Sequence, residues 1–318
     1  MKKLEVRDLK KYYKVLDGTL HAVDGVSIGI DEGRTLGVVG ESGCGKSTLG
    51  KTILRLTEPT AGEVWFDGEN VSALPAAKFQ RYRPAMQMIF QDPFSSLDPR
   101  MSIKQLIAEP LIIYKRTGSK KETEQRVREL MDVVGLARRL EDSYPHELDG
   151  GRRQRIGIAR ALSLDPSFIV CDEPVSALDV SIQAQVINLL QDLQKDKNLT
   201  YMFITHDLSV VRHISDDICV MYLGQVVETC PSKELFKKPL HPYTKALLSA
   251  IPVPRVKNRP KRILLKGEIV SPIDPEPGCR FAARCPYAEE KCRAVDPELT
   301  EFEPGHFAAC HRAKEING

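Results

Sequence analysis

The stretch Gly40-Glu41-Ser42-Gly43-Cys44-Gly45-Lys46-Ser47 decides the fold of this chain. It follows an apolar run at residues 36–39 and opens a second apolar run, with helical spacing, from Thr48 to Leu54. A strand, a glycine-rich turn and a helix start direct backbone N–H groups and the positive end of a helix dipole at one point. Residues 40–48, here called the phosphate loop, therefore predict a cradle for nucleotide phosphates. Lys46 would bind the β and γ phosphates, and the Ser47 hydroxyl would bind their Mg²⁺.

The composition is that of an ordinary soluble globular protein, with 318 residues, a net charge of +3, 42% hydrophobic and 28% charged residues. No run of about eighteen apolar residues exists, and the first five residues contain no apolar signal core. We therefore expect a protein that is neither secreted nor membrane-spanning. A nucleotide site places the eight cysteines in a reducing cytosol, where disulfides are rare.

Polar residues follow three apolar runs that we predict to be strands, residues 86–90, 168–171 and 201–205. The residues directly after these runs are Gln91, then Asp172 with Glu173, then His206. Open α/β sheets carry their site residues at strand ends, so we expect these side chains near the phosphate loop. Asp172 suits Mg²⁺, and Glu173 suits polarising a water for attack on the γ phosphate.

Strands alternate with helices along much of the chain, which predicts a mostly parallel sheet. Residues 4–30 alternate apolar and polar side chains and predict short antiparallel strands. Apolar residues at helical spacing between residues 103 and 140 indicate a helical insertion. Gly150 and Gly151 precede a further helix that runs to about Ser163. Paired glycines at the start of a helix leave its backbone N–H groups open to an anion, so this helix offers a second anion-binding N-terminus besides that of the phosphate loop.

The order of these motifs resembles the nucleotide-binding subunits of ABC transporters over residues 1–250, with a helical subdomain at about 92–160. The resemblance implies an α/β fold of the P-loop NTPase (RecA-like) type, with a mostly parallel sheet, an antiparallel β subdomain and a helical insertion. It also implies ATP and Mg²⁺ as cofactors. For nucleotide binding it assigns Tyr13 to the adenine ring, residues 40–48 to the Walker A loop, Asp172 to the Walker B aspartate and Asp179 to the D-loop. For catalysis it assigns Glu173, the switch histidine His206 and the Q-loop glutamine Gln91, which is also a Mg²⁺ ligand.

In this family two such subunits face each other head to tail. Each ATP lies between the Walker A loop of one subunit and two glycines of the other. These glycines belong to a short motif that is called the family signature. ATP binding closes the pair, hydrolysis opens it, and the loop that carries Gln91 passes the motion to a membrane partner. The resemblance therefore implies a second ATPase subunit and two transmembrane permease subunits as partners.

The signature of this chain departs from the Leu-Ser-Gly-Gly-Gln of the family, because Asp149 precedes Gly150 and Gly151 and Arg152 follows them. A serine would donate to the γ phosphate, whereas an aspartate would repel it. Two unit charges about 4 Å apart cost up to roughly 4 kcal/mol at an effective dielectric near 20. Pairing of Asp149 with Arg152 would offset part of this cost. We hypothesise that this signature serves a weaker ATP site, which favours a heterodimer of two different ATPase subunits.

The composition changes from Ile251 onward, where prolines and basic residues at 252–262 indicate a stiff cationic connector. Beyond it, a segment with little apolar material carries Cys279, Cys285, Cys292 and Cys310. Such a segment is too small to be stabilised by a hydrophobic core and needs a cross-link, which could be disulfides, zinc or an iron–sulfur cluster. A reducing compartment disfavours disulfides, and zinc ligands usually stand closer together along the chain. The wide spacing suits a larger cluster.

The C-terminal part of the chain, residues 241–318, is here called the tail. It resembles one group within the family more narrowly, the ATPases of oligopeptide, dipeptide and nickel importers. The similar stretches are residues 241–248 (HPYTKALL), residues 279–286 (CRFAARCP), Cys292 and residues 309–311 (ACH). Members of that family can hold a [4Fe–4S] cluster on such cysteines, with a structural or sensing role. The resemblance further implies an extracytoplasmic substrate-binding protein and a peripheral location on the cytoplasmic face of the cell membrane. Peptide is favoured over nickel as the substrate, although the permease and binding protein determine it.

Two other functions compete with an importer ATPase. Soluble ABC ATPases that act on ribosomes or DNA usually carry two nucleotide domains or a long coiled coil, and this sequence has neither, so we expect no nucleic-acid partner. A regulatory subunit that binds ATP without turnover is the second alternative. Glu173 and His206 argue against it, because both suit hydrolysis.

Overall fold

A computed structural model describes residues 1–251, 262–265, 267 and 270–318. Most of the predicted basic connector, residues 252–261, lies outside the described residues. The chain packs into two compact units. Unit 1 contains Met1, residues 31–34 and residues 74–202, and unit 2 contains residues 2–30, 35–73 and 203–318. The domain boundary near residue 250 and the helical subdomain at about 92–160 stay predictions.

Unit 2 contains a four-stranded sheet in the order β2-β1-β4-β5. Its strands are β1 (Lys2–Val15), β2 (Gly18–Asp31), β4 (Ala61–Phe66) and β5 (Glu69–Asn70). The expectation of short strands is wrong, because β1 and β2 each span 14 residues. The register between β1 and β4 shifts between Arg7 and Lys10, around a positive φ of 43° at Asp8. This bulge absorbs a break in the alternation without ending the strand.

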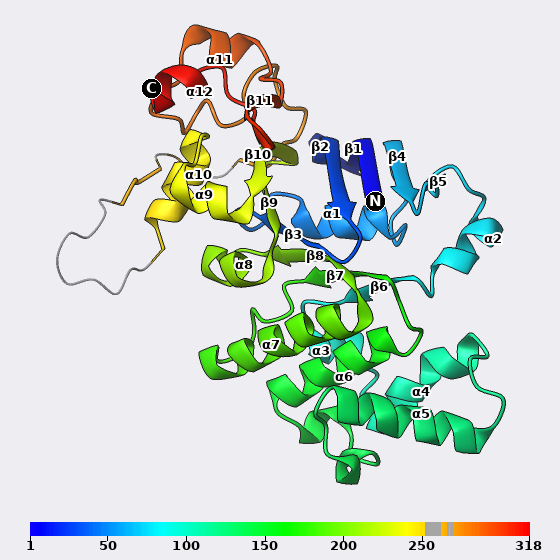
Figure 1. The fold of residues 1–318 in the computed structure, drawn as a ribbon. Helices are drawn as coiled ribbons and strands as arrows, with labels where there is room; N and C mark the ends of the chain where they lie inside the picture. The colour runs from blue at the N-terminus through cyan, green and yellow to red at the C-terminus, as the bar shows by residue number, and fades with distance from the viewer. Residues whose placement is uncertain (252–261, 266, 268–269) are drawn as a thin grey trace. The chain divides into compact units, whose positions relative to one another are not determined.

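A second set of strands in unit 2 follows the order β11-β12-β10-β9-β3. These are β3 (Thr35–Val39), β9 (Asp217–Tyr222), β10 (Gln225–Pro231), β11 (Thr300–Glu303) and β12 (His306–Ala308). Strand β3 is buried throughout and pairs in parallel with β9, whereas β10, β11 and β12 pair antiparallel. The cysteine-rich tail therefore contributes two strands to the edge of this sheet (Figure 1).

Six α-helices accompany these strands in the described part of unit 2. They are α1 (Lys46–Ile53), α8 (Leu208–Ile214), α9 (Ser232–Lys237), α10 (Pro242–Ser249), α11 (Glu290–Ala294) and α12 (Ala313–Asn317). The predicted helix after the phosphate loop is confirmed as α1, which buries Leu49 and Ile53.

Unit 1 is mainly helical. The expected strands at its centre are present as β6 (Met86–Ile89) and β7 (Phe168–Asp172), which pair in parallel. Its helices are α2 (Ala76–Phe79), α3 (Pro93–Ser96), α4 (Ile103–Ile113), α5 (Lys120–Val133), α6 (Gly150–Leu162) and α7 (Val180–Lys197). Short 3₁₀ turns occur at Gln80–Tyr82, Arg138–Leu140 and Pro145–Glu147. Strand β8 (Thr200–Thr205) runs from the end of unit 1 into unit 2.

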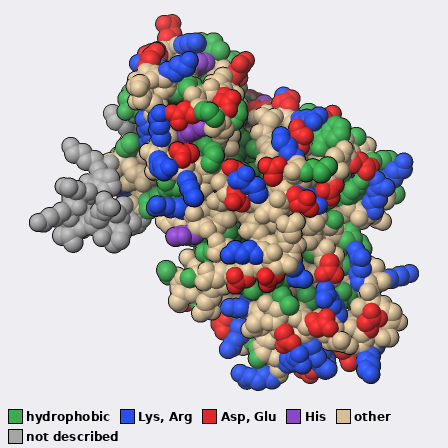
Figure 2. Space-filling model, in the orientation of Figure 1, with side chains coloured by type: hydrophobic (Ala, Val, Ile, Leu, Met, Phe, Trp, Pro, Cys, Tyr) green, Lys and Arg blue, Asp and Glu red, His purple; other side chains and the backbone are tan. Residues whose placement is uncertain are grey.

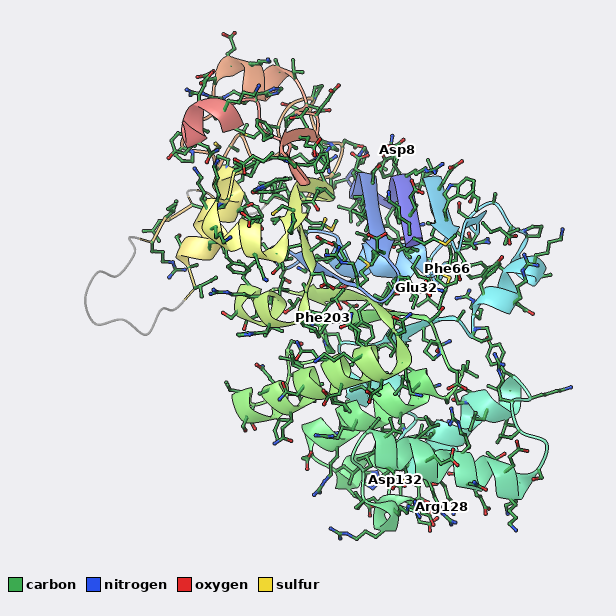
Figure 3. The ribbon with its side chains drawn as sticks, viewed as in Figure 1. Asp8, Glu32, Phe66, Arg128, Asp132 and Phe203 are labelled. Carbon is green, nitrogen blue, oxygen red and sulfur yellow. The ribbon has the colours of Figure 1, made fainter. Side chains whose placement is uncertain are left out.

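The helical segment of unit 1 is held by local polar contacts. The Gln105 side chain accepts from the Ser102 backbone N–H at 2.8 Å, which satisfies this N–H group at the start of α4. Arg128 and Asp132 both lie on α5 (Figure 3) and reach the segment that follows the helix. The Arg128 Nε atom lies 3.0 Å from Glu141 Oε2, and Asp132 accepts from Arg138 Nε at 3.1 Å. These exposed pairs fix the turn after α5 more than they stabilise the fold.

The visible surface carries acidic and basic side chains interspersed with one another (Figure 2). This agrees with a net charge of only +3 for the whole chain. Among the described residues, none of the helices combines the length and the apolar character needed to span a bilayer.

Candidate nucleotide-binding site

The phosphate loop of unit 2 encloses a buried lysine at the first position of α1. Only 4% of Lys46 is exposed, and its Nζ atom donates to the carbonyl oxygens of Gly40 at 2.8 Å and Glu41 at 2.9 Å. Gly45, the residue before the helix, has φ 103°, which turns the chain sharply into α1. The ammonium group therefore already lies at the centre of the loop, as a phosphate-binding lysine requires.

Glycine is required at the base of this loop because the backbone packs closely there. A Cβ atom on Gly40 would come within 2.2 Å of the Met221 carbonyl oxygen, and one on Gly45 within 2.0 Å of the Ala22 carbonyl oxygen. The crest of the loop, Ser42 and Gly43, is instead exposed. The loop is thus closely packed below and exposed at its crest, where an anion could approach it.

Cys44 packs beneath the loop and does not face solvent. It is 2% exposed, and its Sγ atom lies 3.8 Å from Lys46 Nζ. Burial raises the pKa of the Cys44 thiol, so the side chain stays neutral. Ser47 and Thr48 are half-buried in the first turn of α1.

The structure brings two predicted catalytic residues of unit 1 together at the end of β7. The Gln91 Nε2 atom donates to Glu173 Oε2 at 3.0 Å, although 82 residues separate them. Asp172, the last residue of β7, is 3% exposed, and Glu173 is 9% exposed. Glu173 also adopts φ 45°, a conformation that costs a residue other than glycine free energy and often marks a functional site.

The altered signature begins helix α6 of unit 1. Asp149 is the N-cap residue, and its Oδ1 atom accepts from the Arg152 backbone N–H at 2.8 Å. The Arg152 guanidinium lies 3.5 Å from Asp149 Oδ2, so the pairing that would offset the repulsion is present. A Cβ atom on Gly151 would come within 2.6 Å of Ile182 in α7, whereas one on Gly150 would meet Leu178 at 3.1 Å. Close packing against Ile182 of α7 therefore requires a glycine at position 151.

The other predicted contacts lie on the surface of their own units. Tyr13 of unit 2 is 36% exposed, with Lys11 Nζ 4.8 Å from its ring centroid. His206 follows β8 directly and is exposed, and Asp179 of unit 1 is the exposed N-cap residue of α7. Sequence reasoning missed two residues that contact the phosphate loop, Tyr243 and Arg284. In the sequence, the one indication of these residues is that they lie in the stretches that resemble the importer ATPases, Tyr243 in residues 241–248 and Arg284 in residues 279–286.

The four cysteines of the tail line one small cavity in unit 2. Burial, together with the other three cysteines, raises the pKa of the Cys279 thiol to about 11. A set of four thiols around one cavity could hold a metal ion or an iron–sulfur cluster. Glu228, Cys230 and His306 are a separate group, whose possible ligand atoms lie within 4.8 Å of one another.

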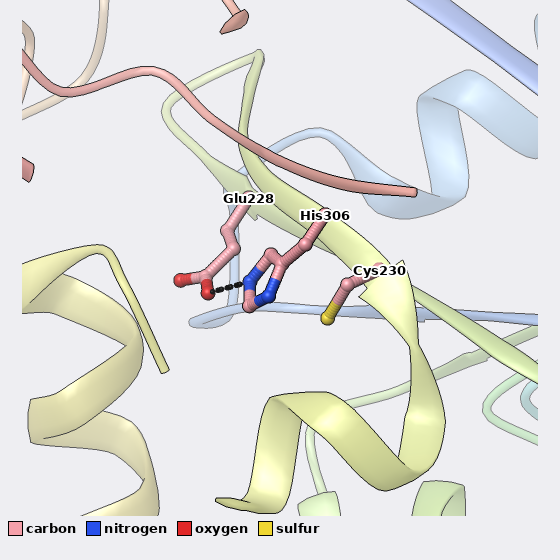
Figure 4. A group of neighbouring side chains, drawn as sticks. All are labelled: Glu228, Cys230 and His306. Carbon is pink, nitrogen blue, oxygen red and sulfur yellow. Dashed lines mark hydrogen bonds and ion pairs between the residues drawn. The ribbon is translucent and has the colours of Figure 1, made fainter. Parts of the chain in front are cut away.

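Glu228 and His306 form a buried hydrogen-bond network, and Cys230 lies beside it (Figure 4). The Glu228 carboxylate already accepts from the backbone N–H groups of Leu240 at 2.7 Å and His241 at 2.8 Å. The His306 Nε2 atom lies 2.7 Å from the same carboxylate. A metal ion would have to displace these contacts. The network instead fastens β12 and the start of α10 to β10.

Replacing this carboxylate should destabilise unit 2. We expect Glu228→Ala to lower the free energy of unfolding by about 3 to 5 kcal/mol, because two backbone N–H groups and an imidazole lose their partner in a buried place. Urea unfolding followed by circular dichroism measures this. The matched variant Glu276→Ala, at an exposed position of the tail, should change stability by less than about 0.5 kcal/mol. Equal stability of the two variants would contradict the assigned role.

Comparison with known proteins identifies the family. The family model described as ABC transporter matches residues 23–176, and the model described as oligopeptide/dipeptide transporter, C-terminal region, matches residues 227–292. The chain is 54% identical to the putative oligopeptide transport ATP-binding protein YkfD of Bacillus subtilis over 97% of this chain and 94% of that one. The chain belongs to the oligopeptide transport ATP-binding proteins of the ABC transporter family.

A further relative agrees in sequence, and two solved ABC cassettes agree in fold. The oligopeptide transport ATP-binding protein AppF of Bacillus subtilis is 52% identical over 97% of this chain and 96% of its own. The ATP-binding cassette MJ0796, solved as a dimer bound to ADP and phosphate, superposes with a TM-score of 0.67 at 30% identity, over 72% of this chain and 98% of that one. The cassette cbiO1 from Clostridium perfringens superposes with a TM-score of 0.66 at 28% identity, over 74% of this chain and 91% of that one. The expected P-loop NTPase fold is therefore confirmed.

Proposed function

We propose that this chain is the ATP-hydrolysing subunit of an ABC importer that takes up dipeptides or oligopeptides. The observation that carries the proposal is the presence of two family regions on one chain, the ABC transporter region and the oligopeptide/dipeptide transporter C-terminal region. The relatives with 52 to 54% identity are named for oligopeptide transport. A nickel or other small-solute importer is the second candidate, since the permease and binding protein choose the substrate.

The geometry of each unit suits one part of ATP hydrolysis. In unit 2, the N–H groups of the phosphate loop and the Lys46 ammonium would hold the β and γ phosphates. Ser47 in unit 2, and Asp172 and Gln91 in unit 1, carry oxygens of the kind that Mg²⁺ prefers, and the ion would neutralise charge on these phosphates. In unit 1, Glu173 would orient a water and accept its proton as the water oxygen attacks the γ phosphorus. The bond from that phosphorus to the bridging oxygen breaks, which releases ADP and phosphate.

We further propose that the active assembly pairs this chain with a different ATPase subunit. The Asp149 carboxylate occupies the N-terminus of α6, where it accepts from the Arg152 N–H group. An anion that approaches the same helix end from a partner subunit meets a negative charge that Arg152 only partly compensates. The chain's own phosphate loop would then depend on a serine-containing signature from another protein.

Restoring the serine tests this arrangement. We expect Asp149→Ser to raise ATP hydrolysis by the purified chain about tenfold, because it removes the part of the repulsion, about 1.4 kcal/mol, that Arg152 leaves uncompensated at a homodimer site. Phosphate release at increasing protein concentration gives the readout, and Asp142→Ser, at another exposed acidic position of unit 1, is the matched control. Cooperative hydrolysis by the unmodified chain as a homodimer, with no gain from the serine, would rule out the heterodimer.

The permease partners would dock near Gln91. Phe90 and Phe94 flank this residue in the sequence and are 41% and 58% exposed. Exposed aromatic side chains of this size suit a protein interface. A permease docked there would place the chain on the cytoplasmic face of the membrane and transmit the movement of Gln91. An extracytoplasmic binding protein would deliver the peptide.

Reconstitution tests the transport function directly. The chain is combined with its partner ATPase, permease pair and binding protein in lipid vesicles. ATP hydrolysis and uptake should rise several-fold when the binding protein carries a short peptide and should not respond to Ni²⁺. A response to Ni²⁺ alone would favour the second candidate, and hydrolysis that neither the permease pair nor the loaded binding protein stimulates would favour a soluble ATPase.

We propose that Cys279, Cys285, Cys292 and Cys310 hold a [4Fe–4S] cluster. The support is a donor set of four thiols around one cavity, whose spacing along the chain is wider than that of usual zinc ligands. The chain purified without oxygen should contain iron and sulfide, and the cluster should absorb light at about 400 nm. Cys285→Ala should remove this absorbance, whereas Cys219→Ala, at a buried cysteine of β9, should keep it. Stoichiometric zinc without iron would overturn the assignment.

A further inference from the structure

The loop between the first two tail cysteines contacts the phosphate loop. Arg284, one residue before Cys285, places Nη1 2.7 Å from Glu41 Oε2 and Nη2 3.2 Å from Glu41 Oε1. The pair is bidentate and poorly accessible, since 9% of the Arg284 side chain and 23% of the Glu41 side chain are exposed. Paired geometry of this kind orients both groups more strongly than a single contact.

A second arginine of the same loop holds a neighbouring turn. Arg280, one residue after Cys279, donates to the Leu223 carbonyl oxygen and pairs with Asp24. The next residue of that turn, Gly224, donates its N–H to the carbonyl oxygen of Cys44 at 2.8 Å. Arg280 therefore supports the base of the phosphate loop through this turn, while Arg284 contacts the loop directly.

Aromatic packing fixes the loop between the two arginines. Phe281 is 1% exposed, and its ring centroid lies 5.3 Å from that of Tyr222 and 5.5 Å from that of Tyr243. The Tyr243 hydroxyl oxygen accepts from the Glu41 backbone N–H at 2.9 Å. Glu41 is thus held at its side chain by Arg284 and at its backbone by Tyr243, and both partners belong to the tail motifs.

This arrangement has an electrostatic consequence for the nucleotide. Glu41 brings a negative charge into a loop that must receive a polyanion, and Lys46 bonds to the backbone carbonyl of the same residue. Bidentate pairing with Arg284 neutralises that charge and keeps the carboxylate turned toward the tail. Arg280 follows Cys279 directly and Arg284 precedes Cys285 directly, so a group bound by these two cysteines would restrain both arginines.

We propose that residues 279–285 are a clamp on the phosphate loop, in which Arg284 is a positioning residue for ATP and occupancy of the cysteine site sets the affinity for ATP. The proposal rests on the proposed ATPase function and adds a coupling between its two sites. Coupling of this kind is reciprocal, so bound ATP must also protect the cysteine site.

Binding of a fluorescent ATP analogue with Mg²⁺ to the full chain tests the clamp. We expect Arg284→Gln to raise the Kd about five- to twentyfold, a common size for coupling between sites. The matched control Arg293→Gln, one residue after Cys292 and exposed, should leave the Kd unchanged. Adding Glu41→Gln to Arg284→Gln should restore most of the affinity, because it removes the charge that Arg284 neutralises. Equal Kd values for Arg284→Gln and the unmodified chain overturn the clamp.

Arg284→Lys provides a milder variant in case the glutamine variant folds poorly. It keeps the charge but loses the bidentate geometry, so we expect a Kd increase of about two- to fivefold. If the unmodified chain itself binds no ATP analogue, the proposed ATPase function fails and not the clamp alone.

The reciprocal effect, that of bound ATP on the cysteine site, is measured as the rate at which the tail cysteines react with a thiol reagent. We expect ATP with Mg²⁺ to slow the reaction of the tail cysteines with a thiol reagent about threefold or more in the unmodified chain, and to have no such effect in Arg284→Gln. Protection that is absent in the unmodified chain, or unchanged in Arg284→Gln, would show that the two sites are independent.

Discussion

Glu173→Gln should lower ATP hydrolysis by the assembled transporter by about 10²- to 10⁴-fold while ATP remains bound. The amide keeps the size of the side chain and can still form a hydrogen bond to Gln91, which lies 3.0 Å away. It cannot accept a proton from the attacking water. The nucleotide site should therefore close on ATP and stay closed. Phosphate release gives the rate, and rapid gel filtration shows whether unhydrolysed ATP remains on the protein.

The matched control is Glu124→Gln, which makes the same chemical change at an exposed position on α5 of the same unit. It should hydrolyse ATP at the unmodified rate. Normal hydrolysis by the Glu173 variant would remove this residue from the catalytic step. If the unmodified complex binds ATP but never releases phosphate, the chain is a regulatory subunit instead.

Lys46→Ala should lower the affinity for ATP by about two to four orders of magnitude. The ammonium group would form charged hydrogen bonds to two phosphates, and each such bond contributes about 1.5 to 3 kcal/mol. The lysine is already buried and held by two carbonyl oxygens of the loop, so little ordering is needed on binding. Equilibrium binding of a fluorescent ATP analogue with Mg²⁺ gives the affinity.

Lys51→Ala serves as its control, because Lys51 is exposed in the last turn of the same helix α1. Its affinity for ATP should match that of the unmodified chain. Circular dichroism establishes whether the Lys46 variant is folded, which separates lost binding from lost structure. Full affinity in a folded Lys46→Ala protein would show that the phosphates bind elsewhere.

The phosphate loop could be predicted from sequence because its chemistry is local. A strand, four residue identities and a helix start within about twenty residues specify it, and the structure places Lys46 inside that loop. The contact between Gln91 and Glu173 followed less directly, from the rule that site residues gather at strand ends.

Contacts between distant segments could not be read from sequence. Arg284 and Glu41 are separated by 243 residues, and nothing in the local pattern of either one indicates the pair. The alternation over residues 4–30 predicts short strands, whereas β1 continues past the bulge at Asp8 because it pairs with β4 on both sides of it. Tertiary pairing also decides that β11 and β12 join the sheet of unit 2, since short strands carry a weak signal.

The pairing of β12 with β10 has a practical consequence for work with shortened proteins. A chain that stops before residue 300 would present the outer edge of β10 with its backbone N–H and C=O groups unsatisfied. Such an edge pairs readily with a second chain and favours aggregation. Expression of the cassette without its tail should therefore yield insoluble material, even where the nucleotide motifs are intact.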